Sequence, residues 1–162
     1  MKYLFYYSES TFPFAGIAAS MQVGVLATEP PFDMDTLKKL PLWGDSHQAK
    51  GMPHYFGTDA HGCPVYAIWN AGSPTMVKNL ISSFLEIFEI PKKNIILINS
   101  GFVDDFTSIL ASTLVHYPIT VKLGELLIHK ILNKYYDDIS ILVGKRNAQN
   151  LTKTTSYQIM LP

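Results

Sequence analysis

The stretch YYSESTFPFAG, which starts at Tyr6, has the residues and spacing of a small ligand site. An apolar run predicts a strand that ends here, and a run of small residues predicts a helix that begins directly after it. Backbone N–H groups at such a turn can bind phosphate or another anion, because the helix dipole is positive at that end. The hydroxyls of Ser8, Ser10 and Thr11 add further donors. The turn is therefore the first candidate for a ligand site.

A second polar segment ends the apolar run NIILINSG, which predicts another strand followed by a loop at 99–102. In open parallel sheets, ligands bind at the carboxyl ends of the strands, near the point where the strand order reverses. If the two strands are neighbours, their polar ends form one crevice. The residues predicted to bind a ligand there are Ser8, Ser10, Thr11, Asn99 and Ser100. The alternative is that these hydroxyls only cap helices.

The elements that must position these residues alternate along the chain. Short apolar strands follow helical segments, which predicts an α/β fold with a mostly parallel sheet and helices on both faces. Asp33 is expected to cap a short helix that ends near Leu40, and the clearest helix begins at Ser73. The other predicted helices cover about 14–23 and the segment FVDDFTSILASTLVHY.

The segment HYFGTDAHGCPVYAIW predicts a β-hairpin inserted at the edge of the sheet, with its turn at 59–62. Pro64 opens the second strand of this hairpin. Because proline cannot complete a central ladder of hydrogen bonds, it indicates that this strand lies at an edge.

The segment after Pro118 has two interpretations, between which periodicity does not decide. In one, a helix to Tyr135 is followed by a strand at 139–143. In the other, a strand at 126–131 is followed by a helix. We expect one α/β domain over 1–146 and a polar, flexible or loosely docked tail over 147–162.

Composition excludes several classes of function. The chain has 13 basic and 13 acidic residues and is only 16% charged, so we expect no nucleic-acid partner. No apolar run approaches the roughly 20 residues that span a bilayer, so we expect no membrane partner. A single cysteine indicates a reducing, cytoplasmic compartment. Nine Tyr and nine Phe residues indicate an apolar surface that could hold two copies together as a homodimer.

Metal-binding and acid-base groups have ordinary structural explanations. Side chains that zinc prefers occur at four positions, His47, His54, His61 and Cys63. The predicted hairpin separates His54 from His61, so we expect turn and surface histidines and no metal or cofactor. Asp104 and Asp105 could form a pair of carboxylates, but we expect both in the first turn of a helix, where negative charge favours the dipole.

The order of these segments resembles an uncharacterised, sporulation-associated family of small α/β proteins from spore-forming Firmicutes. The resemblance spans roughly residues 3–146 and would make this chain a divergent member. It rests on the helix string NLISSFLEIF and on Tyr6, Tyr7, Ala18, Ala19, Gly24, Leu26, Gly57, Asp59, Gly62, Val65 and Tyr66. The family implies a strand at 126–131 and a helix at about 134–146. The family has no established reaction, so the resemblance implies a fold but no activity.

In that family the first strand ends Y-Y-C-x-G-G-x-H-S-S. The loop is similar to that of low-molecular-weight tyrosine phosphatases, where a cysteine attacks a phosphate held by loop amides and an arginine. Here Ser8 replaces the cysteine, Ser10 and Thr11 replace the glycines, and Pro13 replaces the histidine. A serine needs an activating base, and residues with a Cβ restrict the φ angles that let amides converge. With Arg146 as the only arginine, we expect no phosphatase of this type.

The sequence thus favours a non-catalytic binding protein with an unidentified protein or small-molecule partner. Its low charge, its many aromatic residues and the altered loop support this interpretation. The alternative is an enzyme that acts on a small polar or phosphorylated substrate at the carboxyl ends of the strands.

Overall fold

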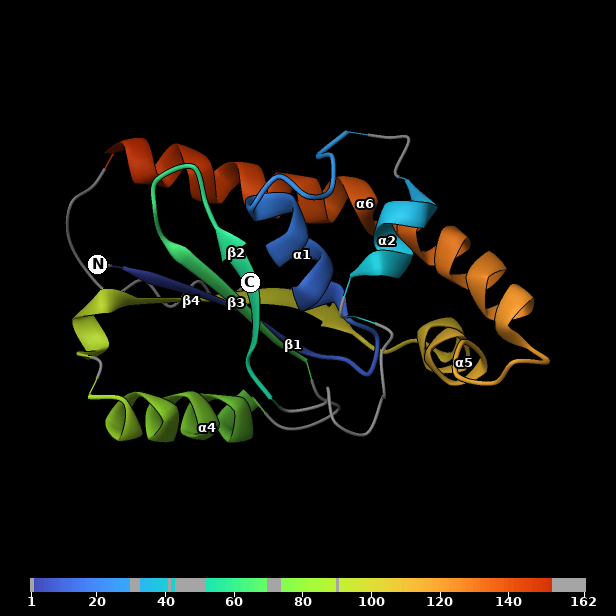
Figure 1. Cartoon of the computed structure of the whole chain (residues 1–162), viewed down its shortest axis with the longest axis horizontal. Helices are drawn as coiled ribbons and strands as arrows, with labels where there is room; N and C mark the ends of the chain where they lie inside the picture. The colour runs from blue at the N-terminus through green and yellow to red at the C-terminus, as the bar shows by residue number, and fades with distance from the viewer. Residues whose placement is uncertain are drawn as a thin grey trace.

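A computed structural model describes residues 2–29, 33–40, 42, 52–69, 74–89 and 91–152. It contains one four-stranded sheet of order β2-β3-β1-β4 (Figure 1). The strands are β1 (Tyr3–Glu9), β2 (His54–Thr58), β3 (Pro64–Trp69) and β4 (Ile95–Val103). β1 pairs in parallel with β3 and β4, and β2 pairs with β3 antiparallel. The protein therefore has a mixed α/β fold whose mostly parallel sheet includes one antiparallel pair.

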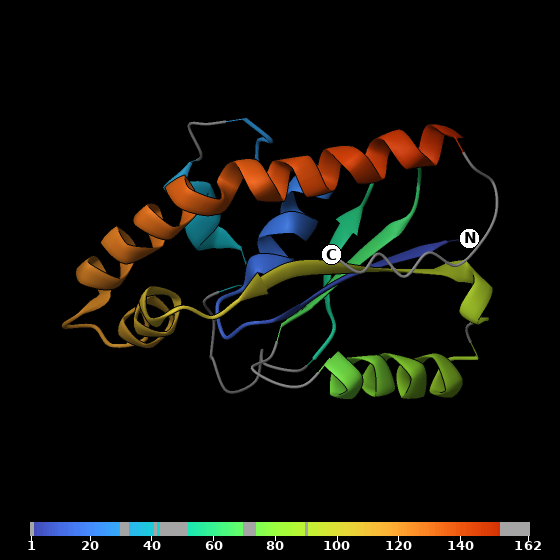
Figure 2. The ribbon, with the colours of Figure 1, turned by 180° about the vertical axis from the view of Figure 1, so that it is seen from behind.

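The helices lie between and after these strands along the chain. They are α1 (Phe14–Gln22), α2 (Met34–Lys39), α4 (Pro74–Ile87), α5 (Phe106–Leu114) and α6 (Val121–Thr152), with a 3-10 turn η1 at Lys92–Asn94. Asp33 caps α2, because its carboxylate accepts hydrogen bonds from the amides of Asp35 and Thr36. In Figures 1 and 2, α1 and α6 lie on one side of the sheet and α4 lies on the other.

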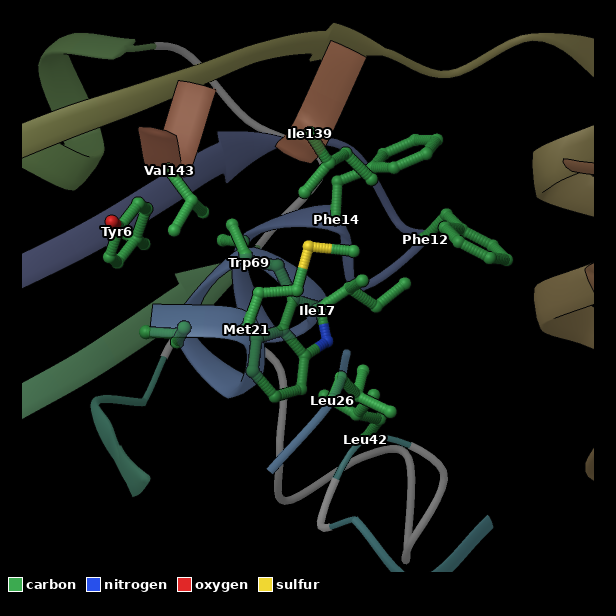
Figure 3. Packing of buried hydrophobic residues seen from close by; sticks show 14 of the residues in the cluster. Tyr6, Phe12, Phe14, Ile17, Met21, Leu26, Leu42, Trp69, Ile139 and Val143 are labelled. Carbon is green, nitrogen blue, oxygen red and sulfur yellow. The ribbon is translucent and has the colours of Figure 1, made fainter. Parts of the chain in front are cut away.

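Alternate side chains of β1 enter two separate apolar clusters, because successive residues of a strand point to opposite faces. Leu4 and Tyr6 belong to the larger cluster, with α1 and α6, whereas Phe5 and Tyr7 pack with the buried side of α4. All nine residues of α1 are buried, which agrees with its small side chains. Figure 3 shows the larger cluster, which includes Tyr6, Trp69, Ile17, Met21, Ile139 and Val143.

Pro64 does not mark an edge strand, so that prediction is wrong. β3 lies between β2 and β1, and the outer strand on this side is β2. Pro64 is the first residue of β3 and pairs with Thr58, whereas the parallel ladder with β1 begins one residue later, at Val65. A proline is tolerated at the first residue of a strand, where the central ladder needs no donor from it.

The C-terminal segment is one helix, so both strand predictions, at 126–131 and at 139–143, are wrong. α6 runs for 32 residues from Val121 to Thr152. Its buried apolar residues recur every three or four positions and form one stripe against the sheet and α1, namely Ile128, Ile131, Leu132, Tyr136, Ile139 and Val143. Residues 147–152 of the predicted tail form the end of α6, and 153–162 lie outside the described residues.

α5 and the first part of α6 extend beyond the carboxyl end of β4. Figures 1 and 2 show α5 past this end of the sheet, beside the start of α6. The two helices contact each other, and Thr120 Oγ1 donates a hydrogen bond to the Leu114 carbonyl at 2.9 Å. We refer to residues 106–128 of these two helices and their connection as the α5–α6 hairpin. Among the described helices, none is long and apolar enough to cross a membrane.

Candidate functional site

The loop between β1 and α1 is held by a carboxylate that follows directly after β4. The Thr11 amide donates to Asp104 Oδ2 at 2.7 Å, and the Phe12 amide lies 3.4 Å from Asp104 Oδ1. Ser10 Oγ also donates to Asp104 Oδ1 and accepts from the Phe12 amide at 3.0 Å. Two amides and one hydroxyl thus converge on one anion, as expected of an anion-binding turn. The anion is a side chain of the protein itself.

Asp104 lies before α5 and is not its N-cap, so the prediction that it lies in the first turn of this helix is wrong. The N-cap is Asp105, whose Oδ1 accepts from the Ser108 amide at 2.7 Å while Ser108 Oγ accepts from the Asp105 amide at 2.8 Å. These bonds from Ser108, with the nearby Lys134 ammonium, lower the pKa of Asp105. An aspartate pair before a helix has only one N-cap position, so the other carboxylate is available for a distant partner. The presence of two aspartates for one N-cap position is therefore the sequence feature that points to a separate role for Asp104.

Three hydroxyls at this end of the sheet have no hydrogen-bond partner among the described residues. They belong to Ser8, Thr11 and Ser100. Ser8 is fully buried and pairs with Trp69, so it lies on the sheet face covered by α1. Ser100 is also buried and lies on β4 between Ile98 and Phe102, both of which pack in the same cluster. The predicted residues Ser8 and Ser100 therefore share one face.

Asn99 and Ser100 lie in a strand, not in the predicted loop at 99–102. β4 continues to Val103, and its register against β1 shifts between Tyr7 and Glu9. Gly101 has a φ of 74° in this irregular region and donates its amide to Asn99 Oδ1 at 2.9 Å. Asn99 pairs with Tyr7, whose side chain packs with α4. Strand alternation thus places Asn99 on the face opposite Ser8.

Aromatic side chains fill the space beside the loop. Phe12 and Phe14 are buried, and their ring centroids lie 4.7 Å apart. The Phe14 ring lies 4.8 Å from that of Phe102 on β4 and 5.4 Å from that of Tyr135 on α6. Figure 3 shows Phe12 and Phe14 with the core residues of α1 and α6. This packing fixes the loop against the sheet, so that its amides point to Asp104 and its aromatic side chains fill the core.

A second polar cluster, which the sequence did not reveal, lies near the start of β3. Tyr6 donates its hydroxyl to Gln22 Oε1 at 2.8 Å, and Gln22 Nε2 donates to Asn147 Oδ1 at 2.9 Å. Burial is the main cause of a raised pKa for the Tyr6 hydroxyl. Arg146 is buried here, and burial lowers the pKa of its guanidinium. The only arginine thus belongs to this cluster and to the charge environment of Tyr6 and Asp59.

The hairpin residues considered as metal ligands have other contacts. The ring of His54 stacks on Trp69 with centroids 4.9 Å apart. The amides of His61 and Cys63 both donate to Asp59 Oδ1, at 2.9 and 2.8 Å, which stabilises the turn between β2 and β3. Burial and the Asp59 carboxylate raise the pKa of the Cys63 thiol. No three described His, Cys, Asp or Glu side chains are grouped to hold a metal ion, and His47 lies outside the described residues.

Comparison with known proteins gives a family but no activity. No curated protein and no solved structure matches the chain. One family model matches residues 3–147, from the first residue of β1 into the last turns of α6. The matched range contains the β1–α1 loop, Asp104 and the buried cluster around Arg146. The chain therefore belongs to the family described as "Protein of unknown function (DUF3189)".

Proposed function

We propose that this protein is a non-catalytic, cytoplasmic binding protein that acts by associating with another protein chain. The observation that carries the proposal is the Asp104 carboxylate on the amides of Thr11 and Phe12, because the groups that would hold a substrate anion are occupied. Ser8 stands where a nucleophile would be, but its hydroxyl bonds to no described base. A serine needs such a base to react. The single cysteine supports a reducing compartment.

The surface proposed for association is the α5–α6 hairpin together with the end of β4. Ile119 at the tip is 98% exposed and Phe106 is 80% exposed, both far above what a buried core residue shows. The apolar side chains exposed on this surface are Val103, Phe106, Ile109, Tyr117, Ile119, Leu123 and Leu126. If each exposes on the order of 100 Å², the total approaches the roughly 800 Å² that each partner buries in a standard interface.

The partner we propose is a second copy of the chain. Segment 103–126 has four charged residues, of which Asp104 holds the loop, Asp105 caps α5 and Glu125 pairs with Lys38 at 2.9 Å. A surface with Lys122 as its remaining charge suits an apolar partner better than a charged one. Two copies also do not repel each other, because the chain has a formal net charge of zero.

Self-association can be measured by sedimentation velocity with the wild-type chain and two variants. Ile119→Asp places a charge on the proposed surface, and Ile87→Asp is the matched control, since Ile87 is 75% exposed at the end of α4. We expect a wild-type dimer, at least tenfold weaker dimerisation for Ile119→Asp and no change for Ile87→Asp. A wild-type monomer up to about 1 mM, or equal weakening by both variants, would contradict self-association on this surface.

A second candidate function is catalysis on a small polar or phosphorylated substrate. The observation that favours it is the set of three hydroxyls, of Ser8, Thr11 and Ser100, without described partners at the carboxyl ends of β1 and β4. Turnover of a generic phosphomonoester by the wild-type chain, lost in Ser8→Ala, would support this alternative. No turnover above that of Ser8→Ala supports the non-catalytic proposal.

The resemblance to a family of spore-forming Firmicutes supports a role connected with sporulation.

A further inference from the structure

We infer that the β1–α1 loop is a binding site for a tetrahedral oxyanion, such as phosphate or sulfate, and that the Asp104 carboxylate occupies this site from within the chain. The inference does not depend on self-association, because the donors and the carboxylate that carry it belong to one chain. It predicts that removal of the carboxylate creates an anion site without any new residue being added.

The first observation is the direction of the donors. The Thr11 amide, the Phe12 amide and the Ser10 hydroxyl all meet the two oxygens of one carboxylate, which comes from a residue 93 positions away from Thr11. Neutral donors that converge in this way satisfy a negative charge without a cation, as turns and helix N-termini do when they bind anions. The helix that follows, α1, has no side-chain N-cap at Pro13. The carboxylate is therefore the anion at this turn.

The second observation is a set of hydroxyls without described partners at the same end of the sheet. Ser8 is fully buried and Ser100 is 7% exposed, and neither hydroxyl has a partner among the described residues. The Thr11 hydroxyl, on the loop itself, also has no hydrogen-bond partner among the described residues. A buried hydroxyl without a partner is unfavourable, and the oxygen of a bound anion would supply the missing acceptor. A carboxylate offers two oxygens, whereas phosphate and sulfate offer four, which suits this larger set of donors.

Asp104 excludes a free anion because it is attached to the chain. A tethered group has an effective concentration that a free ligand at low millimolar level does not match. Glu9, which precedes the loop, adds repulsion. Once the carboxylate is removed, two amides and one hydroxyl support a dissociation constant on the order of 1 mM for phosphate.

The experiment compares wild type, Asp104→Ala and Asp104→Asn, titrated with inorganic phosphate and sulfate at constant ionic strength. Asp104→Asn is the matched control, because its amide oxygen keeps an acceptor in the same volume without the charge. The readouts are the amide NMR signals of Thr11 and Phe12 and the thermal midpoint. The midpoint of each variant is compared with that of wild type in the same salt, which corrects for the general stabilisation of folded proteins by these anions.

We expect saturable shifts of the Thr11 and Phe12 signals, and a raised midpoint, only in Asp104→Ala. If Asp104→Ala is folded and its signals do not move at 50 times the expected dissociation constant, the inference is wrong. It is also wrong if the wild-type signals titrate equally. If Asp104→Ala is unfolded in chloride, recovery of its circular dichroism in phosphate or sulfate supports the site, and no recovery contradicts it. The shifts of the Thr11 and Phe12 signals report on the loop within one chain, so this readout is distinct from the sedimentation test of self-association.

Discussion

Replacement of Gly124 by alanine should destabilise the protein, although the same change normally stabilises a helix. Gly124 lies in the first turn of α6, where it faces the end of α5. A Cβ there would lie 2.8 Å from the Val115 nitrogen and 3.0 Å from the Val115 Cα. Both are backbone atoms, so α5 and α6 must move apart to admit the methyl group. Alanine gains about 1 kcal/mol in helix propensity, whereas overpacking costs about 1–3 kcal/mol.

Gly144 provides the control in the same helix, because no atom would lie within 4 Å of a Cβ at this position. Gly144→Ala should therefore raise the free energy of unfolding by up to about 1 kcal/mol. Gly124→Ala should lower it by up to about 2 kcal/mol, which is the cost of overpacking less the gain in helix propensity. The two variants should then differ by about 1–3 kcal/mol, which corresponds to roughly 2–12 °C in the thermal midpoint of a chain of this size.

Urea unfolding followed by circular dichroism measures both variants against wild type. A Gly124→Ala variant as stable as Gly144→Ala would refute the close approach of α5 and α6. A Gly144→Ala variant less stable than wild type would contradict the open surroundings of Gly144 in α6.

Three further predictions follow from the hydrogen bonds and pKa shifts. Asp105→Ala removes the cap that bonds to Ser108 and should cost about 1 kcal/mol at pH 7. The pKa of Asp105 is lowered in the folded state, so this cost should be complete above its ordinary value of 3.8 and fade as the pH falls below it in urea titrations. Tyr6→Phe should cost about 1–3 kcal/mol in the same assay, because Gln22 loses a buried donor. Cys63, whose thiol pKa is raised by burial, should react with iodoacetamide at pH 7 more slowly than in the urea-unfolded chain. Equal rates would contradict that environment.

Much of the local structure could be predicted, because it depends on residues close together in the sequence. The apolar run before Ser8 forms β1, Asp33 caps α2, and the turn at 59–62 joins β2 to β3. Each element has its signal within a few residues, in periodicity, capping or turn chemistry. The edge-strand prediction from Pro64 fails because an edge position depends on whether another strand lies beyond β3, which is not a local property.

The C-terminal segment shows where a local pattern fails. Its apolar residues, such as those at 126–131 and 139–143, are dense enough to suit a short buried strand or a buried helix. Packing against α1 and the sheet decides for one helix, because only helical spacing places Ile128, Ile139 and Val143 on the same stripe.

The sequence alone determined that this protein is an α/β chain with a strand-to-helix turn shortly after Tyr7, because apolar strands and small-residue helices are local features. Only the tertiary structure decided what that turn holds. β1 and β4 are neighbours, and this pairing brings the Asp104 carboxylate to the amides of the β1–α1 loop. One of these is the amide of Thr11, which is 93 positions away in the chain. A contact over that distance depends on strand order, and strand order is set by the packing of the whole sheet.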